Sequence, residues 1–298
     1  MRTGKVRSNP IITSEMKIKM RGWRTALGIA AYLGVLMLIG FLYYMAFIQT
    51  NMSWNSSVNA RQEAGMQIYI ALAVVQFALI LLITPAQTAG TVSGEREKQT
   101  LDLLLATKIS SVGIIFGKLI SSMSYILLLI ITSIPLFSLV FLFGGVTPGD
   151  MLQLFIFYMI TAFAVGSIGI FYSTLFKRTV MSTVVTYITI FFLGLVSVIL
   201  GAYMISIQYS GTMPQPSNPT VPFVLYINPA VGLADILVTE PGGFSTLLGL
   251  SIGPVGRLDF WIVNSMVMLV VAAMLLIISM YKINPVRRIS FKKGKKRK

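Results

Sequence analysis

Six apolar stretches run along the chain, and each is long enough to cross a lipid bilayer as a helix. A spanning helix needs about 20 consecutive, mostly apolar residues. The stretches are residues 25–48, 66–88, 114–143, 151–176, 179–207 and 260–281. The third and fifth are longer than a straight span requires, so we expect tilt or protruding ends there. The pattern predicts an all-α polytopic membrane protein with six transmembrane helices.

The segment before the first span, residues 9–24, has the pattern of an amphipathic helix. Asn9 can cap its start, and its apolar residues share one face while basic residues lie on others. We predict an interfacial helix at the inner membrane surface, with Lys17, Lys19 and Arg21 among its basic residues. A charged continuation of the first span is the simpler alternative.

A long connection, residues 210–259, separates the fifth and sixth spans. It contains two apolar runs, each too short or too often interrupted by proline and glycine to span. We predict that this outer segment forms short helices resting at the membrane surface. A pair of half-spans that enter the membrane remains an open alternative.

Basic residues are distributed unequally between the two sides of such a six-span chain. Of 24 Lys and Arg residues, only Arg61 and Arg257 fall on the side opposite the termini. Because basic loops stay in the cytoplasm, both termini are predicted to be cytoplasmic in a cell-membrane protein. The basic tail, residues 282–298, is expected to contact anionic lipids. It has one aromatic residue and no domain around it, which disfavours nucleic-acid binding.

The predicted spans contain few groups that could carry chemistry. None of the nine acidic residues lies in a span, and the chain has no histidine and no cysteine. Coupled secondary transporters usually bury acids or histidine, and intramembrane enzymes need catalytic groups or metal ligands. We therefore predict no catalytic, cofactor or metal site in this chain.

Polar residues within the spans are candidates for lining a transport pathway, although hydrogen bonds between helices are the simpler interpretation. These candidates are Gln76, Gln87, Ser121, Ser124, Tyr158 and Thr161. The run "GIIFGKL" (113–119) is one residue too short for a phosphate loop and ends in leucine instead of Ser or Thr. Lys118 within it is expected to extend toward the membrane surface. Energy for uphill transport would therefore come from a partner.

A dense polar cluster, "GEREKQTLDLLLATK" (94–108), interrupts the apolar pattern between the second and third spans. It resembles the signature of ABC-2 type transporter permeases, and Gly117 and Lys118 match the Gly-Lys that follows in that family. Lys108 departs from the pattern, which usually has proline there. The matching residues within the cluster are Gly94, Glu95, Arg96, Glu97, Thr100, Leu104, Leu105 and Thr107.

The resemblance implies that this segment carries a coupling helix that contacts a separate ATP-binding subunit. Thr100 can cap such a helix, and Leu101, Leu104 and Leu105, at positions i, i+3 and i+4, give an apolar face suited to a groove on another protein. The glutamates are expected to meet basic groups of the partner or of the interfacial helix. A solvated connector is the alternative. The predicted interface comprises Glu95, Arg96, Glu97, Thr100, Leu101, Leu104 and Leu105.

The resemblance further implies a single permease domain over residues 1–298 of an ABC transporter, acting as an exporter. The expected assembly has two permeases, like or unlike, and two ATP-binding subunits, which hold the ATP and magnesium. The substrate is left open. The alternative function is a membrane sensor or scaffold that docks an ATPase or another partner without carrying substrate.

Overall fold

The computed structural model describes residues 22–50, 58–101, 111–210, 222–237 and 259–283. Within these ranges the chain forms helices and no strands. Six helices are long and apolar enough to cross a membrane, which confirms the predicted fold class. They are α2 (Trp23–Thr50), α3 (Val58–Thr88), α6 (Ser111–Ser138), α7 (Pro148–Leu175), α8 (Thr179–Ser210) and α11 (Phe260–Ile283). The shorter helices are α4 (Ser93–Glu97), η1 (Leu139–Leu142), η2 (Phe223–Ile227) and α9 (Pro229–Leu237).

The spanning helices begin where local sequence signals allow, not only where the chain becomes apolar. α3 begins at Val58, ahead of the predicted start at residue 66, because polar residues outside the hydrocarbon can continue a helix once it is nucleated. α7 begins with a capping box, in which the Thr147 backbone N–H donates to the Asp150 carboxylate at 2.9 Å. Gly144 (φ 80°) precedes it in a left-handed turn that suits glycine.

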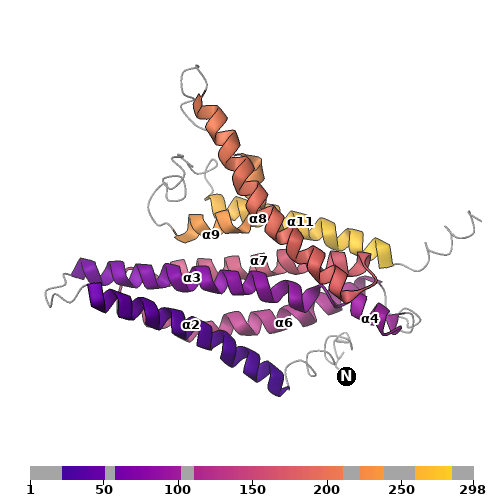
Figure 1. The fold of residues 1–298 in the computed structure, drawn as a ribbon, viewed down its shortest axis with the longest axis horizontal. Helices are drawn as coiled ribbons and strands as arrows, with labels where there is room; N and C mark the ends of the chain where they lie inside the picture. Colours follow the sequence, from indigo (N-terminus) through magenta and orange to yellow (C-terminus); the bar gives the residue numbers. More distant parts are fainter. Residues whose placement is uncertain (1–21, 51–57, 102–110, 211–221, 238–258, 284–298) are drawn as a thin grey trace, which may run out of the picture.

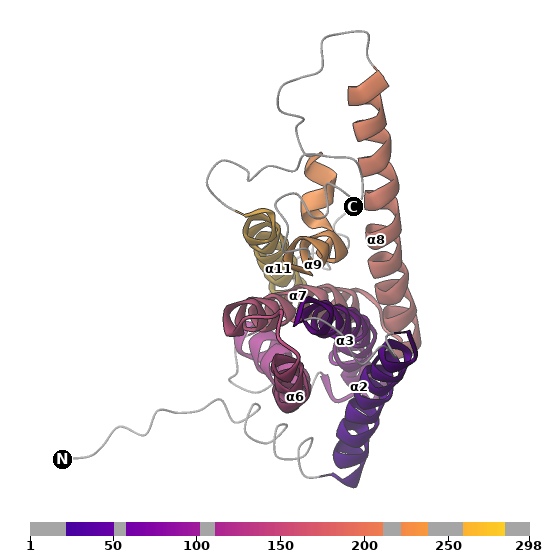
Figure 2. The same cartoon turned by 90° about the vertical axis from the view of Figure 1, so that its left-hand side faces the viewer.

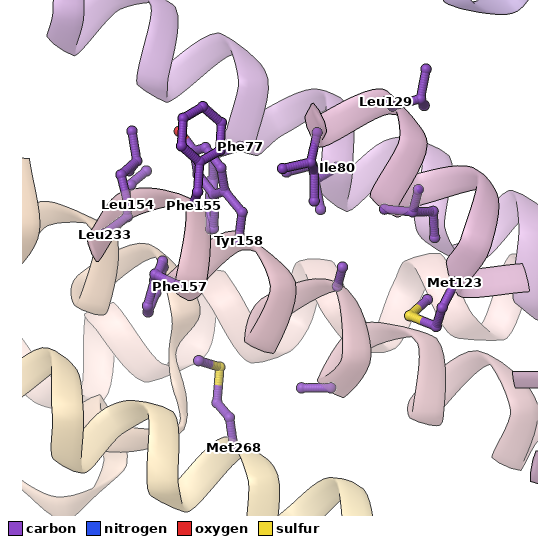
Figure 3. Close-up of a cluster of buried hydrophobic side chains, with 14 of the residues drawn as sticks. Phe77, Ile80, Met123, Leu129, Leu154, Phe155, Phe157, Tyr158, Leu233 and Met268 are labelled. Atoms are coloured by element: carbon purple, nitrogen blue, oxygen red, sulfur yellow. The ribbon is translucent and has the colours of Figure 1, made fainter. Parts of the chain in front are cut away.

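α7 lies at the centre of the bundle and packs against α3, α6, α8, α9 and α11. Figures 1 and 2 show α3, α6 and α11 around it, while α2 lies at the periphery. Aromatic side chains fill the middle of this core: Phe155 and Tyr158 of α7 meet edge to face, and Phe77 of α3 lies beside them (Figure 3). The core therefore forms around one helix.

α8 departs from this compact arrangement. It starts beside the end of α7 and then diverges from the other helices toward its C-terminal end (Figures 1 and 2). Many of its large apolar side chains are exposed, among them Phe191, Ile199 and Tyr203. Exposed apolar side chains are stable in a membrane because lipid tails are as apolar as they are. α8 is thus a spanning helix with little contact to its own bundle.

The two ends of the bundle are distinguished by their short helices. At the α4 end, α3 and α7 finish while α6 and α8 begin; at the α9 end, α8 finishes and α11 begins (Figure 1). η2 and α9 belong to the predicted 210–259 connection, and their helical structure agrees with the predicted helical segment there. Membrane re-entry of this connection stays the alternative interpretation.

Candidate functional site

The polar motif after the second span forms a junction of four helices at the α4 end. Its first part, from Ser93, is the five-residue helix α4. Helix termini leave backbone N–H groups without intrahelical partners. Ser173, in the last turns of α7, satisfies two of them: its Oγ accepts from the backbone N–H of Val92 at 2.8 Å and of Ser93 at 2.9 Å. All three residues are fully buried. α7 therefore caps and fixes the start of α4.

The end of α4 is closed by a Schellman motif. Gln99 has φ 58°, the left-handed conformation that such a motif requires. The backbone N–H of Thr100 donates to the Glu95 carbonyl at 2.9 Å, and that of Gln99 donates to the Arg96 carbonyl at 3.1 Å. The Thr100 hydroxyl also donates to the Glu95 carbonyl, at 3.3 Å. Glu95, Arg96 and Glu97 consequently lie on a short, well-bounded helix.

Glu95 pairs within this chain. Its Oε1 accepts a hydrogen bond from Lys118 Nζ at 2.6 Å. The Lys118 side chain is only 4% exposed and that of Glu95 22% exposed. The prediction that Lys118 extends to the membrane surface is therefore wrong, because a carboxylate inside the fold holds its ammonium group. This ion pair joins α4 to the start of α6.

Glu97 binds the first residue of α8. Its carboxylate accepts from the Thr179 backbone N–H at 2.9 Å and from the Thr179 hydroxyl at 2.8 Å. A carboxylate at a helix N-terminus also interacts favourably with the helix dipole. We expected both glutamates to meet groups of a partner or of the interfacial helix; instead, their described contacts are to α6 and α8.

The other residues of the predicted interface are placed differently from one another. Arg96 Nη1 lies 3.5 Å from the carbonyl of Phe176, the residue after α7. Leu101 is 5% exposed and belongs to the core of this chain, so in this structure it offers no surface to a partner. Thr100 is exposed. The remaining predicted site residues lie outside the described part of the chain: Leu104, Leu105, Lys17, Lys19 and Arg21.

The predicted pathway residues lie mostly between helices. Gln76, Ser121, Tyr158 and Thr161 are buried. Gln76 Nε2 donates to Ser133 Oγ at 2.9 Å, joining α3 to α6. The Tyr158 hydroxyl donates to the Ala73 carbonyl at 2.7 Å, joining α7 to α3. Such bonds hold helices together.

The two remaining predicted pathway residues, Ser124 and Gln87, make hydrogen bonds that involve a backbone carbonyl. The Ser124 hydroxyl donates to the Ile120 carbonyl at 2.7 Å in its own helix. The Gln87 carbonyl accepts from Ser122 at 3.3 Å. An apolar cavity of about 80 Å³ lies between α7, α8, α11 and the start of α9. None of the six predicted pathway residues lines it, so a pathway role for them stays a prediction.

Within the described residues, no cluster of three or more His, Cys, Asp or Glu side chains is placed to hold a metal ion. The contacts of this site connect α4 to the end of α7 and to the starts of α6 and α8. The molecule is an α-helical multi-pass membrane protein in which a short polar helix contacts three spans at one end of the bundle.

Comparison with known families identifies that architecture. The sequence model of the family described as "ABC-2 family transporter protein" matches residues 45–281. This match covers most of the chain and includes α4, so the chain belongs to this family. No curated protein matches the chain. The family makes it a membrane-spanning permease subunit of an ABC transporter, a class that associates with ABC ATP-binding subunits.

Proposed function

We propose that this permease belongs to an exporter and receives its energy from ATP-binding subunits that dock on residues 94–108. The observation that carries the proposal is the four-helix junction around α4. A segment that binds a partner and moves spans must be fastened to those spans, and α4 is bonded to α6, α7 and α8 through Lys118, Ser173 and Thr179.

The proposed orientation places the α4 end in the cytoplasm of a cell-membrane protein. Lys98, Lys118, Lys177 and Arg178 lie at this end, and basic residues favour the cytoplasmic side. Both termini would then be cytoplasmic, and the tail from residue 282 would contact anionic lipids. The α9 end, with η2 and α9, would face outward.

The proposed assembly contains two permeases, identical or homologous, and two ATP-binding subunits that bind ATP and magnesium. This chain would bind neither nucleotide nor metal. ATP-driven closure of the two subunits would displace the coupling segments, and the permeases would switch between inward-facing and outward-facing arrangements. Conformational change of this kind requires that ATP binding favours one of the two arrangements.

Docking is tested by asking whether an ATP-binding subunit co-purifies with the permease, and which leucines it needs. Burial of one leucine contributes about 1.5–3 kcal/mol, so Leu104→Asp should weaken co-purification by about tenfold or more. Leu103→Asp is the matched control: it makes the same change at a position off the predicted apolar face. The proposal predicts a large loss for the first variant and a small one for the second.

Two results would contradict the proposal. Equal retention of the ATP-binding subunit by both variants would show that this face does not dock it. A complex that assembles normally but never responds structurally to ATP would favour the sensor or scaffold alternative. The substrate is not needed for either measurement, because assembly and conformation are observed directly.

A further inference from the structure

Among the residues that the structure describes, few polar side-chain contacts join α8 to other elements. Its first residue is bound by Glu97, as described above. Near its middle, Thr189 Oγ1 donates to the Tyr172 hydroxyl of α7 at 2.9 Å. The Tyr187 hydroxyl donates to the Leu82 carbonyl of α3. Because α8 buries little of its surface, its position depends on these contacts and on those with η2.

The η2 segment holds α8 from the middle of the helix onward. Asn228 Nδ2 donates to the Gly194 carbonyl at 3.0 Å and to Ser197 Oγ at 2.8 Å. Leu225 is 1% exposed and packs so closely on Gly201 that a Cβ there would lie 2.8 Å from its Cγ. α8 is therefore anchored at its start to α4 and from its middle onward to η2, two short elements outside the spans.

The contact between α4 and α8 is close as well as polar. A Cβ at Gly94 would lie 3.3 Å from the Thr179 methyl group, so the backbone of α4 passes close to the first residue of α8. Ser173 fixes the start of α4 to α7, and the Schellman turn fixes its end. Within this frame the exposed Glu97 carboxylate lies against the first turn of α8.

We propose that Glu97 is a positioning residue that clamps the start of α8 to the coupling segment, so that α8 follows any displacement of α4. A helix of 32 residues is about 48 Å long and moves as one body. Displacement of its first turn is carried past the contacts at Thr189 to the η2 anchor. The inference rests on the proposed function, because docking supplies the displacement.

The chain contains no cysteine, so two introduced cysteines can carry spin labels without background. Leu152→Cys on α7 and Tyr203→Cys on α8 are suitable sites, since the two side chains are 63% and 64% exposed. Double electron–electron resonance in lipid nanodiscs then reports the distance from α8 to the central helix. It is measured for the permease alone and for its complex with the ATP-binding subunit, without nucleotide and with ATP and vanadate.

Four variants distinguish loss of the Glu97–Thr179 contact from a general loss of stability. Glu97→Ala removes both hydrogen bonds, and Thr179→Val removes the one to the hydroxyl. Thr179→Ser retains the hydroxyl and should behave like the wild type. Glu63→Ala removes another exposed carboxylate from the opposite end of the bundle and is the matched control.

We expect Glu97→Ala to broaden the α7–α8 distance distribution of the permease alone while the protein remains folded. In the complex it should reduce the population that shifts with ATP and vanadate by about fivefold, the change that corresponds to loss of a typical helix cap. Thr179→Val should act in the same direction, and the double variant should be no worse than Glu97→Ala alone.

The outcomes distinguish the clamp from the proposed function. If the wild-type complex shifts with ATP and vanadate and Glu97→Ala shifts equally, with an unchanged distribution in the permease alone, the clamp proposal is overturned. If the wild-type complex shows no shift, the proposed function fails, and the permease-alone distributions still decide the clamp. A Thr179→Ser variant that resembles Thr179→Val would show that the hydroxyl bond is not responsible.

Discussion

The ion pair between Glu95 and Lys118 allows a quantitative test, because its two members are buried to different extents. Lys118 is 4% exposed and Glu95 is 22% exposed, and their charged atoms are 2.6 Å apart. Removal of one partner from a buried pair is costly because the other charge stays in a poorly solvated site. The cost should therefore depend on which charge remains.

Glu95→Gln leaves the buried ammonium beside a neutral acceptor, and we expect it to lower the free energy of unfolding by about 3 kcal/mol. Lys118→Met leaves the carboxylate of a side chain that is more exposed than that of Lys118, although its Oε2 is buried, so its cost should be smaller, about 1–2 kcal/mol. The double variant retains neither charge. Since replacing both members of a buried pair is often nearly neutral, it should be more stable than Glu95→Gln alone.

Thermal unfolding of the purified permease, followed by intrinsic fluorescence in one detergent, measures these differences. For a chain of this size about 1 kcal/mol corresponds to a shift of roughly 2–4 °C, so Glu95→Gln should lower the midpoint by about 6–12 °C. Lys98→Met, at an exposed position just after α4, is the control and should leave the midpoint unchanged. Equal and additive costs for Glu95→Gln and Lys118→Met would refute the reasoning.

Gly169→Ala should destabilise the contact of α7 with α3 by about 1–3 kcal/mol, since a Cβ there would lie 3.0 Å from Thr88 Cβ; Gly34→Ala, which meets nothing within 4 Å, should be neutral in the same unfolding assay. Burial raises the pKa of Asp235 above its ordinary 3.8, with repulsion from Asp259 adding to it and a hydrogen bond from the Trp261 backbone opposing it. The folded state therefore binds this proton more tightly, and stability falls as pH rises through the raised pKa. Asp235→Asn should raise the unfolding midpoint at neutral pH, and the gain should shrink toward pH 3.8; a gain that grows on acidification would contradict this sign.

The sequence by itself determined the fold class and the number of spans. A bilayer leaves each spanning backbone only its own helix for hydrogen bonding, so apolar length alone predicts six helices. It also singled out the polar cluster from Gly94, which stands out because the stretches on either side are apolar. Family membership followed from that cluster together with the topology, and the match over residues 45–281 agrees.

Tertiary structure decided how these helices pack. α2 and α7 have equal mean hydropathy, yet 11% of the residues in the apolar window of α2 are buried and 61% of those in the window of α7. Lipid solvates apolar side chains as well as another helix does, so hydropathy cannot distinguish a central span from a peripheral one. The divergence of α8 is hidden from the sequence for the same reason.

Tertiary structure also decided what the polar cluster contacts. Glu95 and Glu97 are two residues apart in one hydrophilic run, and nothing local distinguishes them. Their partners lie 23 and 82 residues further along the chain, at Lys118 and Thr179. Both pairings exist because α6 and α8 begin at the end of the bundle where α4 lies, and that meeting of helix ends is a property of packing that no local sequence pattern encodes.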